Sequence, residues 1–171
     1  MSSVLLPWQQ QQWHYVNQRI AQKHLAHAML LTGKTGLGKR LFARYLAQAL
    51  LCSNTGTDHM PCGNCRNCQL YEVGNHPDYL FIEPEDHKKP IRIDQIRTVV
   101  EFLEHTSQSR RYKIVLIDPA ERMNLNAANS LLKTLEEPPG ASMLLLLTSA
   151  PSQLPITIRS RCQQLAFYPP D

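Results

Sequence analysis

The chain has 171 residues, 43% of them hydrophobic and 19% charged, with a formal net charge of +4. These values are typical of one globular domain with a sizeable core, and they exclude a disordered or fibrous chain. The longest apolar run, Met143 to Leu147, is too short to span a bilayer, and the N-terminus lacks the features of a secretory signal. We therefore expect a cytoplasmic protein, and the mild positive charge does not by itself specify a nucleic-acid partner.

Apolar runs alternate with helical stripes along the chain. The runs predict strands at 28–31, 79–82, 113–117 and 143–147, and a last strand near 163–167. Apolar residues at helical spacing predict helices within 41–50, 93–103 and 125–135, followed by a short helix over 156–161. This alternation predicts an α/β fold with a central parallel sheet and helices on both faces. Ligands of such sheets bind at the carboxyl ends of the strands, where a glycine loop, Asp118 and Thr148 fall.

The glycine loop reads LTGKTGLGKR over residues 31–40 and resembles a phosphate-binding loop. Gly33, Gly38 and Lys39 match the pattern G-x-x-x-x-G-K-[ST], and Gly36 lies between them. Glycines let backbone N–H groups face phosphate oxygens at the start of a helix. A register that uses Lys34 as the lysine would put the first glycine inside a strand, so Arg40 occupies the place of the hydroxyl that binds magnesium.

Two positions of this nucleotide site depart from the pattern of an ATP-hydrolysing enzyme. Arg40 offers only donors and cannot coordinate magnesium. Asp118 ends the third strand, but Pro119 follows it where a catalytic acid is expected, and Glu121 is displaced by two further residues. We expect at most weak binding of ATP or ADP and no hydrolysis, with Arg40 in the phosphate cradle or on a free phosphate. A glycine turn that binds no ligand is the alternative.

Four of the five cysteines follow the spacing C-x9-C-x2-C-x2-C. Two-residue gaps allow neighbouring sulfurs to reach one tetrahedral ion, and four thiolates would close its coordination shell. The sequence therefore predicts a structural zinc site formed by Cys52, Cys62, Cys65 and Cys68. Free thiols, an iron–sulfur cluster, and His59 or His76 as substitute ligands remain alternatives.

Several motifs together resemble one family. They are the cysteine run, HPDYLFIEPE over 76–85, NAANSLLKTLEEPPG over 126–140 and IRSRC over 158–162. The chain resembles, over nearly its whole length, the bacterial clamp-loader subunits of DNA polymerase III, which belong to the AAA+ class. The resemblance implies a RecA-like AAA+ domain over 1–171, with a zinc-binding module inserted at 52–74 and with lid and collar domains beyond residue 171.

The resemblance also implies a role and a set of partners. Clamp loaders place a sliding clamp on primed DNA, and the partners would be the gamma/tau ATPase and delta subunits. In the family, the arginine of Ser160-Arg161-Cys162 reaches into the ATP site of a neighbour, where it stabilises charge on the transferred phosphoryl group. Thr148 matches a position that senses the terminal phosphate and is expected to be vestigial here. Without the resemblance, Arg161 would be interpreted as a surface helix residue.

Three functions are compatible with these patterns. Arg40 and Pro119 favour a clamp-loader subunit that does not hydrolyse ATP but supplies Arg161 to its neighbour. The second candidate is the gamma/tau motor, because both kinds of subunit carry the cysteine run and the SRC motif. The third is a zinc-dependent nucleic-acid-binding module, although only Arg66 and Tyr71 supply basic or aromatic character near the cysteines.

Overall fold

A computed structural model of the chain describes residues 5–105, 107 and 111–171. Residues 1–4, which begin the segment used to exclude a secretory signal, lie outside this description. Within the described residues, no helix combines the length and the apolar character needed to cross a membrane.

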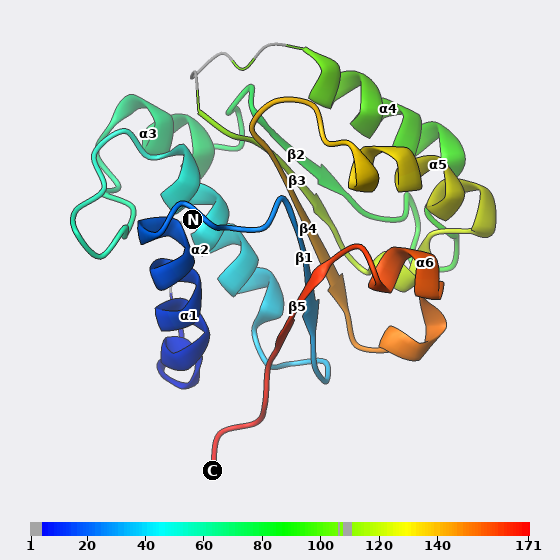
Figure 1. Ribbon diagram of the computed structural model, residues 1–171, viewed down its shortest axis with the longest axis horizontal. Helices are drawn as coiled ribbons and strands as arrows, with labels where there is room; N and C mark the ends of the chain where they lie inside the picture. Colours follow the sequence, from blue (N-terminus) through cyan, green and yellow to red (C-terminus); the bar gives the residue numbers. More distant parts are fainter. Residues whose placement is uncertain (1–4, 106, 108–110) are drawn as a thin grey trace.

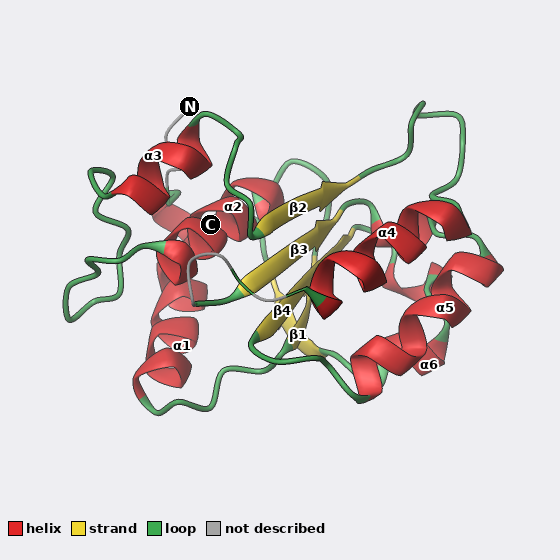
Figure 2. Ribbon diagram, turned by 90° about the horizontal axis from the view of Figure 1, so that it is seen from above, coloured by secondary structure: helices red, strands yellow, loops and turns green. Residues whose placement is uncertain are grey.

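The protein is a three-layer α/β domain (Figures 1 and 2). The described residues form five strands: β1 (Ala28–Thr32), β2 (Tyr79–Ile82), β3 (Lys113–Ile117), β4 (Ser142–Thr148) and β5 (Gln163–Ala166). All of the strand pairs are parallel, and the order across the sheet is β2-β3-β4-β1-β5. The predicted strands are therefore confirmed, with shifts of no more than one residue at their ends.

In the part of the chain that the structure describes, six α-helices cover the two faces of the sheet. They are α1 (Gln10–Ala21), α2 (Lys39–Leu51), α3 (Arg66–Glu72), α4 (Ile93–Glu104), α5 (Leu125–Glu136) and α6 (Ile156–Arg159). Figure 1 shows α1, α2 and α3 on one side of the sheet and α4, α5 and α6 on the other. Three short 3-10 turns, Pro7–Gln9, Ala120–Arg122 and Pro151–Gln153, complete the described elements.

The apolar runs of the strands contribute to the cores on both faces of the sheet, because alternate side chains point to opposite sides. Met29 and Leu31 of β1 pack in the core under α1 and α2, whereas Leu30 packs in the core under α4 and α5. Every residue of β4 is buried, as expected for a central strand covered on both faces.

Two helices were not predicted from the sequence. In α1 the buried stripe consists only of Gln12, Trp13 and Val16, so its periodic signal is weak. In α3 the side chain of Cys65 caps the first turn by accepting a hydrogen bond from the Cys68 N–H. The predicted helix over 156–161 is shorter in the structure, where α6 ends at Arg159.

Candidate functional site

The glycine loop joins β1 to α2 at the carboxyl edge of the sheet. Its backbone takes positive φ at Gly33 (145°), Gly36 (91°) and Gly38 (80°). A Cβ on Gly33 would lie 2.7 Å from the carbonyl oxygen of Phe167, so a larger residue does not fit there. Helix α2 begins at Lys39, and its unpaired first-turn N–H groups give this end a positive field.

Two side chains of an N-terminal turn donate hydrogen bonds to the backbone of the glycine loop. The indole N–H of Trp8 donates to the carbonyl of Leu37 at 3.0 Å. The Gln9 amide is fully buried and donates to the carbonyls of Leu37 at 3.1 Å and Gly38 at 2.8 Å. Sequence analysis missed both residues, because nothing in the run of glutamines at 9–12 distinguishes the one that packs against the loop.

The lysine of the loop turns back onto the loop itself. Lys39 Nζ donates to the carbonyls of Gly33 at 2.6 Å and Lys34 at 2.9 Å. Burial lowers the pKa of Lys39, and the carboxylates of Asp118 and Glu121 oppose that shift. The ammonium group thus occupies the concave side of the loop, and it is available to an anion only after it exchanges these two carbonyls.

Arg40 pairs with the acid at the end of β3. Its Nε lies 2.7 Å from Oδ2 of Asp118, and its guanidinium stacks 5.0 Å from the ring centroid of Phe81. A cation therefore lies directly on the carboxylate that, in the hydrolysing pattern, helps to hold magnesium. The expectation that Arg40 lies in a phosphate cradle or on a free phosphate stays a prediction; in the structure its guanidinium is directed to Asp118.

A cavity of about 410 Å³ lies between the loop, the start of α2 and the segments that follow β3 and β4. Of the predicted nucleotide-binding residues, Gly36, Gly38, Lys39, Arg40 and Asp118 line it. Pro119, Glu121 and Ser149 also line it. The donors and the cations could hold an anion, and Arg40 stands at the position where the magnesium-binding pattern has a hydroxyl.

Two predicted residues lie apart from this cavity. Thr148 is buried, and its hydroxyl accepts the N–H of Ala150 at 3.0 Å, which fixes the turn after β4. The lining near this turn comes from Leu147 and Ser149 instead. Gly33 also does not line the cavity, since it shapes the first bend of the loop beneath Lys39.

The SRC segment lies just after α6, on the face opposite α2. Nε and Nη2 of Arg161 contact Oε1 of Glu136 at 2.8 and 2.6 Å, and Nη1 donates to the carbonyl of Thr157 at 2.8 Å. Ser160 is exposed, and burial raises the pKa of Cys162 to about 11. Arg161 does not line the cavity of its own chain, so any nucleotide that it contacts would be bound elsewhere.

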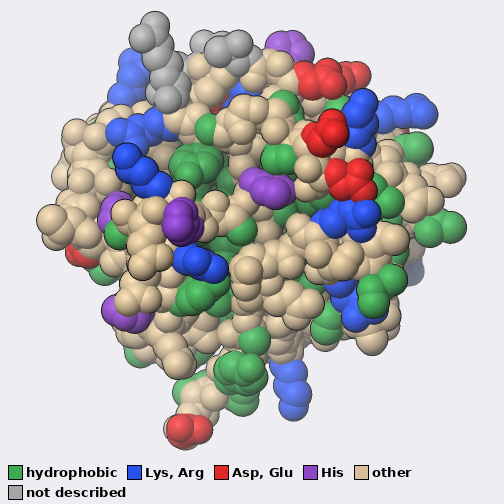
Figure 3. Space-filling model, viewed as in Figure 1, with side chains coloured by type: hydrophobic (Ala, Val, Ile, Leu, Met, Phe, Trp, Pro, Cys, Tyr) green, Lys and Arg blue, Asp and Glu red, His purple; other side chains and the backbone are tan. Residues whose placement is uncertain are grey.

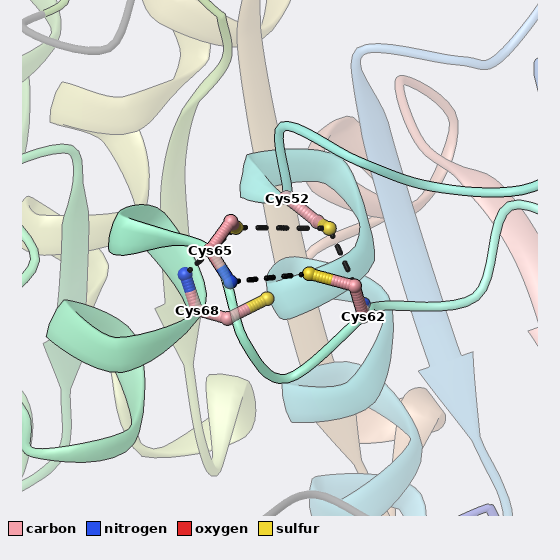
Figure 4. Close-up of side chains that lie close together, drawn as sticks. All are labelled: Cys52, Cys62, Cys65 and Cys68. Atoms are coloured by element: carbon pink, nitrogen blue, oxygen red, sulfur yellow. Dashed lines mark hydrogen bonds between the residues drawn. The ribbon is translucent and has the colours of Figure 1, made fainter.

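The four predicted cysteines meet at the far end of α2 (Figure 4). Cys52 caps the end of α2, Cys62 lies in the following loop, Cys65 caps α3 and Cys68 lies within it. Their sulfurs all lie within 4.8 Å of one another. Among the described residues the cluster includes neither His59 nor His76: the first contacts Asn17, and the second contacts Asn67 and Asp78.

Backbone N–H groups converge on these sulfurs. Cys65 N–H points at the sulfur of Cys62 at 3.2 Å, and Cys62 N–H points at that of Cys52 at 3.3 Å. Burial raises the pKa of Cys65, but N–H groups of Ser53 and Cys68 and the neighbouring thiols bring it down to about 6. Burial raises the pKa of Cys68 to about 12. The cluster could hold a metal ion, which would bind all four groups as thiolates.

Comparisons with known proteins place these features in a family. The family described as "DNA polymerase III, delta subunit" matches residues 8–171. "DNA polymerase III subunit delta'" of Pseudomonas aeruginosa is 49% identical over 162 residues, which cover 95% of this chain and 48% of that protein. "DNA polymerase III subunit tau/gamma" of Haemophilus influenzae is 37% identical over 145 residues, which cover 85% of this chain and 20% of that protein.

A solved structure agrees with these matches. It is a "dna polymerase iii, gamma subunit-related protein" from Thermotoga maritima, with a TM-score of 0.68 and 27% identity, covering 94% of this chain and 47% of that one. The likeness confirms the predicted fold class, a RecA-like AAA+ domain. The chain spans about half the length of the delta' relative that it matches.

Proposed function

Because the chain belongs to the DNA polymerase III delta subunit family, in which its relatives are named delta', we propose that it is the AAA+ domain of a delta-prime-type clamp-loader subunit. It acts in the bacterial cytoplasm during DNA replication, where it helps to load the sliding clamp onto primed DNA. Its partners are the gamma/tau ATPase and delta subunits, and it reaches the clamp and DNA through that complex. The full protein continues into lid and collar domains.

The subunit does not hydrolyse ATP itself. The observation that carries this conclusion is the 2.7 Å contact between Arg40 and Asp118. Arg40 stands where the hydroxyl ligand of magnesium is expected, and its charge neutralises Asp118, the acid that would act beside that ligand. Pro119 has no side-chain base to activate water. The Lys39 ammonium and the glycine loop could still hold phosphate oxygens, so weak ATP or ADP binding without turnover is consistent with the cavity.

Arg161 serves the ATP site of the neighbouring subunit. The support is its place just after α6, away from its own cavity, with 34% of its side chain exposed. A guanidinium offered from another chain stabilises the charge that develops on a transferred phosphoryl group. Because such an arginine is in place only in the assembled arc, hydrolysis would depend on correct assembly.

Zinc in the four-cysteine cluster has a structural role. A closed shell of four thiolates leaves no open position for water or substrate. Bound there, zinc would supply the charge that keeps four thiolates together, and so tie the end of α2 to α3. This role is supported by the convergence of the sulfurs within 4.8 Å.

The motor remains the second candidate, because the tau/gamma relative also matches and Lys39 is retained. A nucleic-acid module ranks third. Acidic and basic side chains are mixed over α4 and α5 (Figure 3), so that part of the surface does not form a basic track.

The test is the DNA-stimulated ATPase rate of the reconstituted clamp loader with full-length subunits. Arg161→Ala should lower the rate by at least about 10³-fold at the site that it serves, with assembly unchanged by size-exclusion chromatography. Lys39→Ala should leave the rate as in the wild type. The reverse result, a silent Arg161→Ala and a loss with Lys39→Ala, would identify a working motor.

A further inference from the structure

The guanidinium of Arg161 is held on two of its sides. Nε donates to Oε1 of Glu136 at 2.8 Å, Nη2 lies 2.6 Å from the same oxygen in an ion pair, and Nη1 donates to the carbonyl of Thr157 at 2.8 Å. Arginine has five N–H donors in a planar fork. Nη1 also makes a long contact of 3.5 Å to Oγ of Ser160. Both N–H groups of Nη1 therefore have partners within the chain, and the N–H of Nη2 that points away from Glu136 is left to donate to a phosphoryl oxygen.

Glu136 lies where a carboxylate is electrostatically unfavourable. It is the last residue of α5, and the C-terminal end of a helix carries partial negative charge. Arg161 supplies the compensating cation from beyond α6, so the pair connects the ends of two helices. Glu137, the next residue, is also exposed but makes no contact with Arg161 among the described residues. The chain thus contains a matched control.

We infer that Glu136 is a positioning residue for Arg161: it fixes the Nε–Nη2 edge, so that the remaining N–H donor of Nη2 is held in one orientation. This inference rests on the proposed function, in which Arg161 contacts the nucleotide of a neighbouring subunit. Preset orientation removes the need to order a flexible side chain during the reaction, and it therefore acts on the rate of the chemical step.

A simpler role for Glu136 predicts different results. If the pair were only a surface ion pair that joins α5 to α6, its loss would lower the melting temperature of the subunit slightly and leave the rate of the complex unchanged. A positioning role instead lowers kcat at saturating ATP and leaves the KM for ATP largely unchanged, since the neighbour's own residues bind the ground-state nucleotide.

The experiment uses the reconstituted clamp loader with full-length subunits and measures DNA-stimulated ATP hydrolysis. Glu136→Ala should lower kcat about tenfold, whereas Glu137→Ala should match the wild type. Glu136→Gln should recover at least half of the lost rate, because its amide oxygen can accept the hydrogen bond from Nε of Arg161. In an Arg161→Ala background, Glu136→Ala should have no additional effect.

Each outcome is informative about one hypothesis. A wild-type rate with Glu136→Ala, together with a loss from Arg161→Ala, would overturn the inference and leave the proposed function standing. A rate that Glu136→Gln does not recover would also overturn the hydrogen-bonded positioning role. If Arg161→Ala itself has no effect, the proposed function fails first. If Glu136→Ala does not assemble, Glu136→Gln in the Arg161→Ala and wild-type backgrounds still measures the coupling.

Discussion

The contact between Arg40 and Asp118 yields a prediction whose magnitude follows from its geometry. The two side chains are 2.7 Å apart, but Arg40 is 49% exposed, so solvent screens most of the direct attraction. An exposed pair of this kind contributes about 0.5–1 kcal/mol. The stacking of the guanidinium on Phe81, at 5.0 Å, adds about 0.5–1 kcal/mol. Arg40→Ala should therefore lower the free energy of unfolding by about 1–2 kcal/mol.

A double-mutant cycle separates the two contributions. Urea unfolding of the wild type, Arg40→Ala, Asp118→Asn and the double variant should give a coupling energy of about 0.5–1 kcal/mol between Arg40 and Asp118. This coupling should shrink in 1 M NaCl, whereas the contribution of Phe81 should change less. A coupling energy indistinguishable from zero at low salt would refute the interpretation that Arg40 neutralises Asp118.

The same pair determines how the protein responds to magnesium. In the presence of ADP, Arg40→Thr supplies the missing hydroxyl and frees the carboxylate of Asp118. Magnesium should then raise the melting temperature of Arg40→Thr but not that of the wild type, with ionic strength held constant by NaCl. Hydrolysis should not return, because Pro119 remains. A rise of equal size in both proteins would show that the guanidinium does not prevent metal binding.

Two further predictions concern the metal cluster and a buried histidine. Metal analysis should find one zinc ion per chain in the wild type and in Cys162→Ser but none in Cys68→Ser. Loss of the metal should lower the free energy of unfolding by about 4 kcal/mol when free zinc is a thousandfold above its dissociation constant. Bound iron with a visible absorption band would contradict the assignment. Burial lowers the pKa of His76 in the folded state, with Asp78 opposing the shift, so the unfolded chain binds the proton more tightly. The free energy of unfolding should therefore fall as the pH drops below about 6.5. The fall should be steeper than in His76→Gln by up to about 1.4 kcal/mol per pH unit. Parallel pH profiles of the two proteins from urea unfolding would show that His76 does not contribute.

The strands could be predicted because each is encoded locally. A strand buried on both faces of a parallel sheet needs a continuous apolar run, and Lys113–Ile117 shows one within five residues. Helix α1 could not be predicted on the same basis. Its glutamines leave few apolar residues, and Trp13 becomes informative only when it packs edge-on against Tyr45, at 4.9 Å between ring centroids.

The contacts of the candidate sites could likewise be predicted from the sequence only in part. The four cysteines are close in sequence, so their spacing alone predicted that they would meet. The partners of Arg40 and Arg161 could not be found from spacing, because Asp118 and Glu136 reach them only through the topology of the sheet and its helices. Thr148 shows that position in the sequence can also suggest a contact that the structure uses differently. Its place at the end of a strand suggested a ligand contact, but its hydroxyl accepts a hydrogen bond from the backbone of the next turn.

The order of the strands also constrains how the chain folds during its synthesis. β1 is made early, yet its two neighbours in the sheet, β4 and β5, are synthesised after the other strands of this sheet. At roughly 10 residues per second, β1 waits on the order of ten seconds for either partner. During that time its apolar Met29–Leu31 segment can be shielded only by helices or by a chaperone. A chain released before Gln163 would keep one edge of β1 open, and such an edge can pair with another molecule and aggregate.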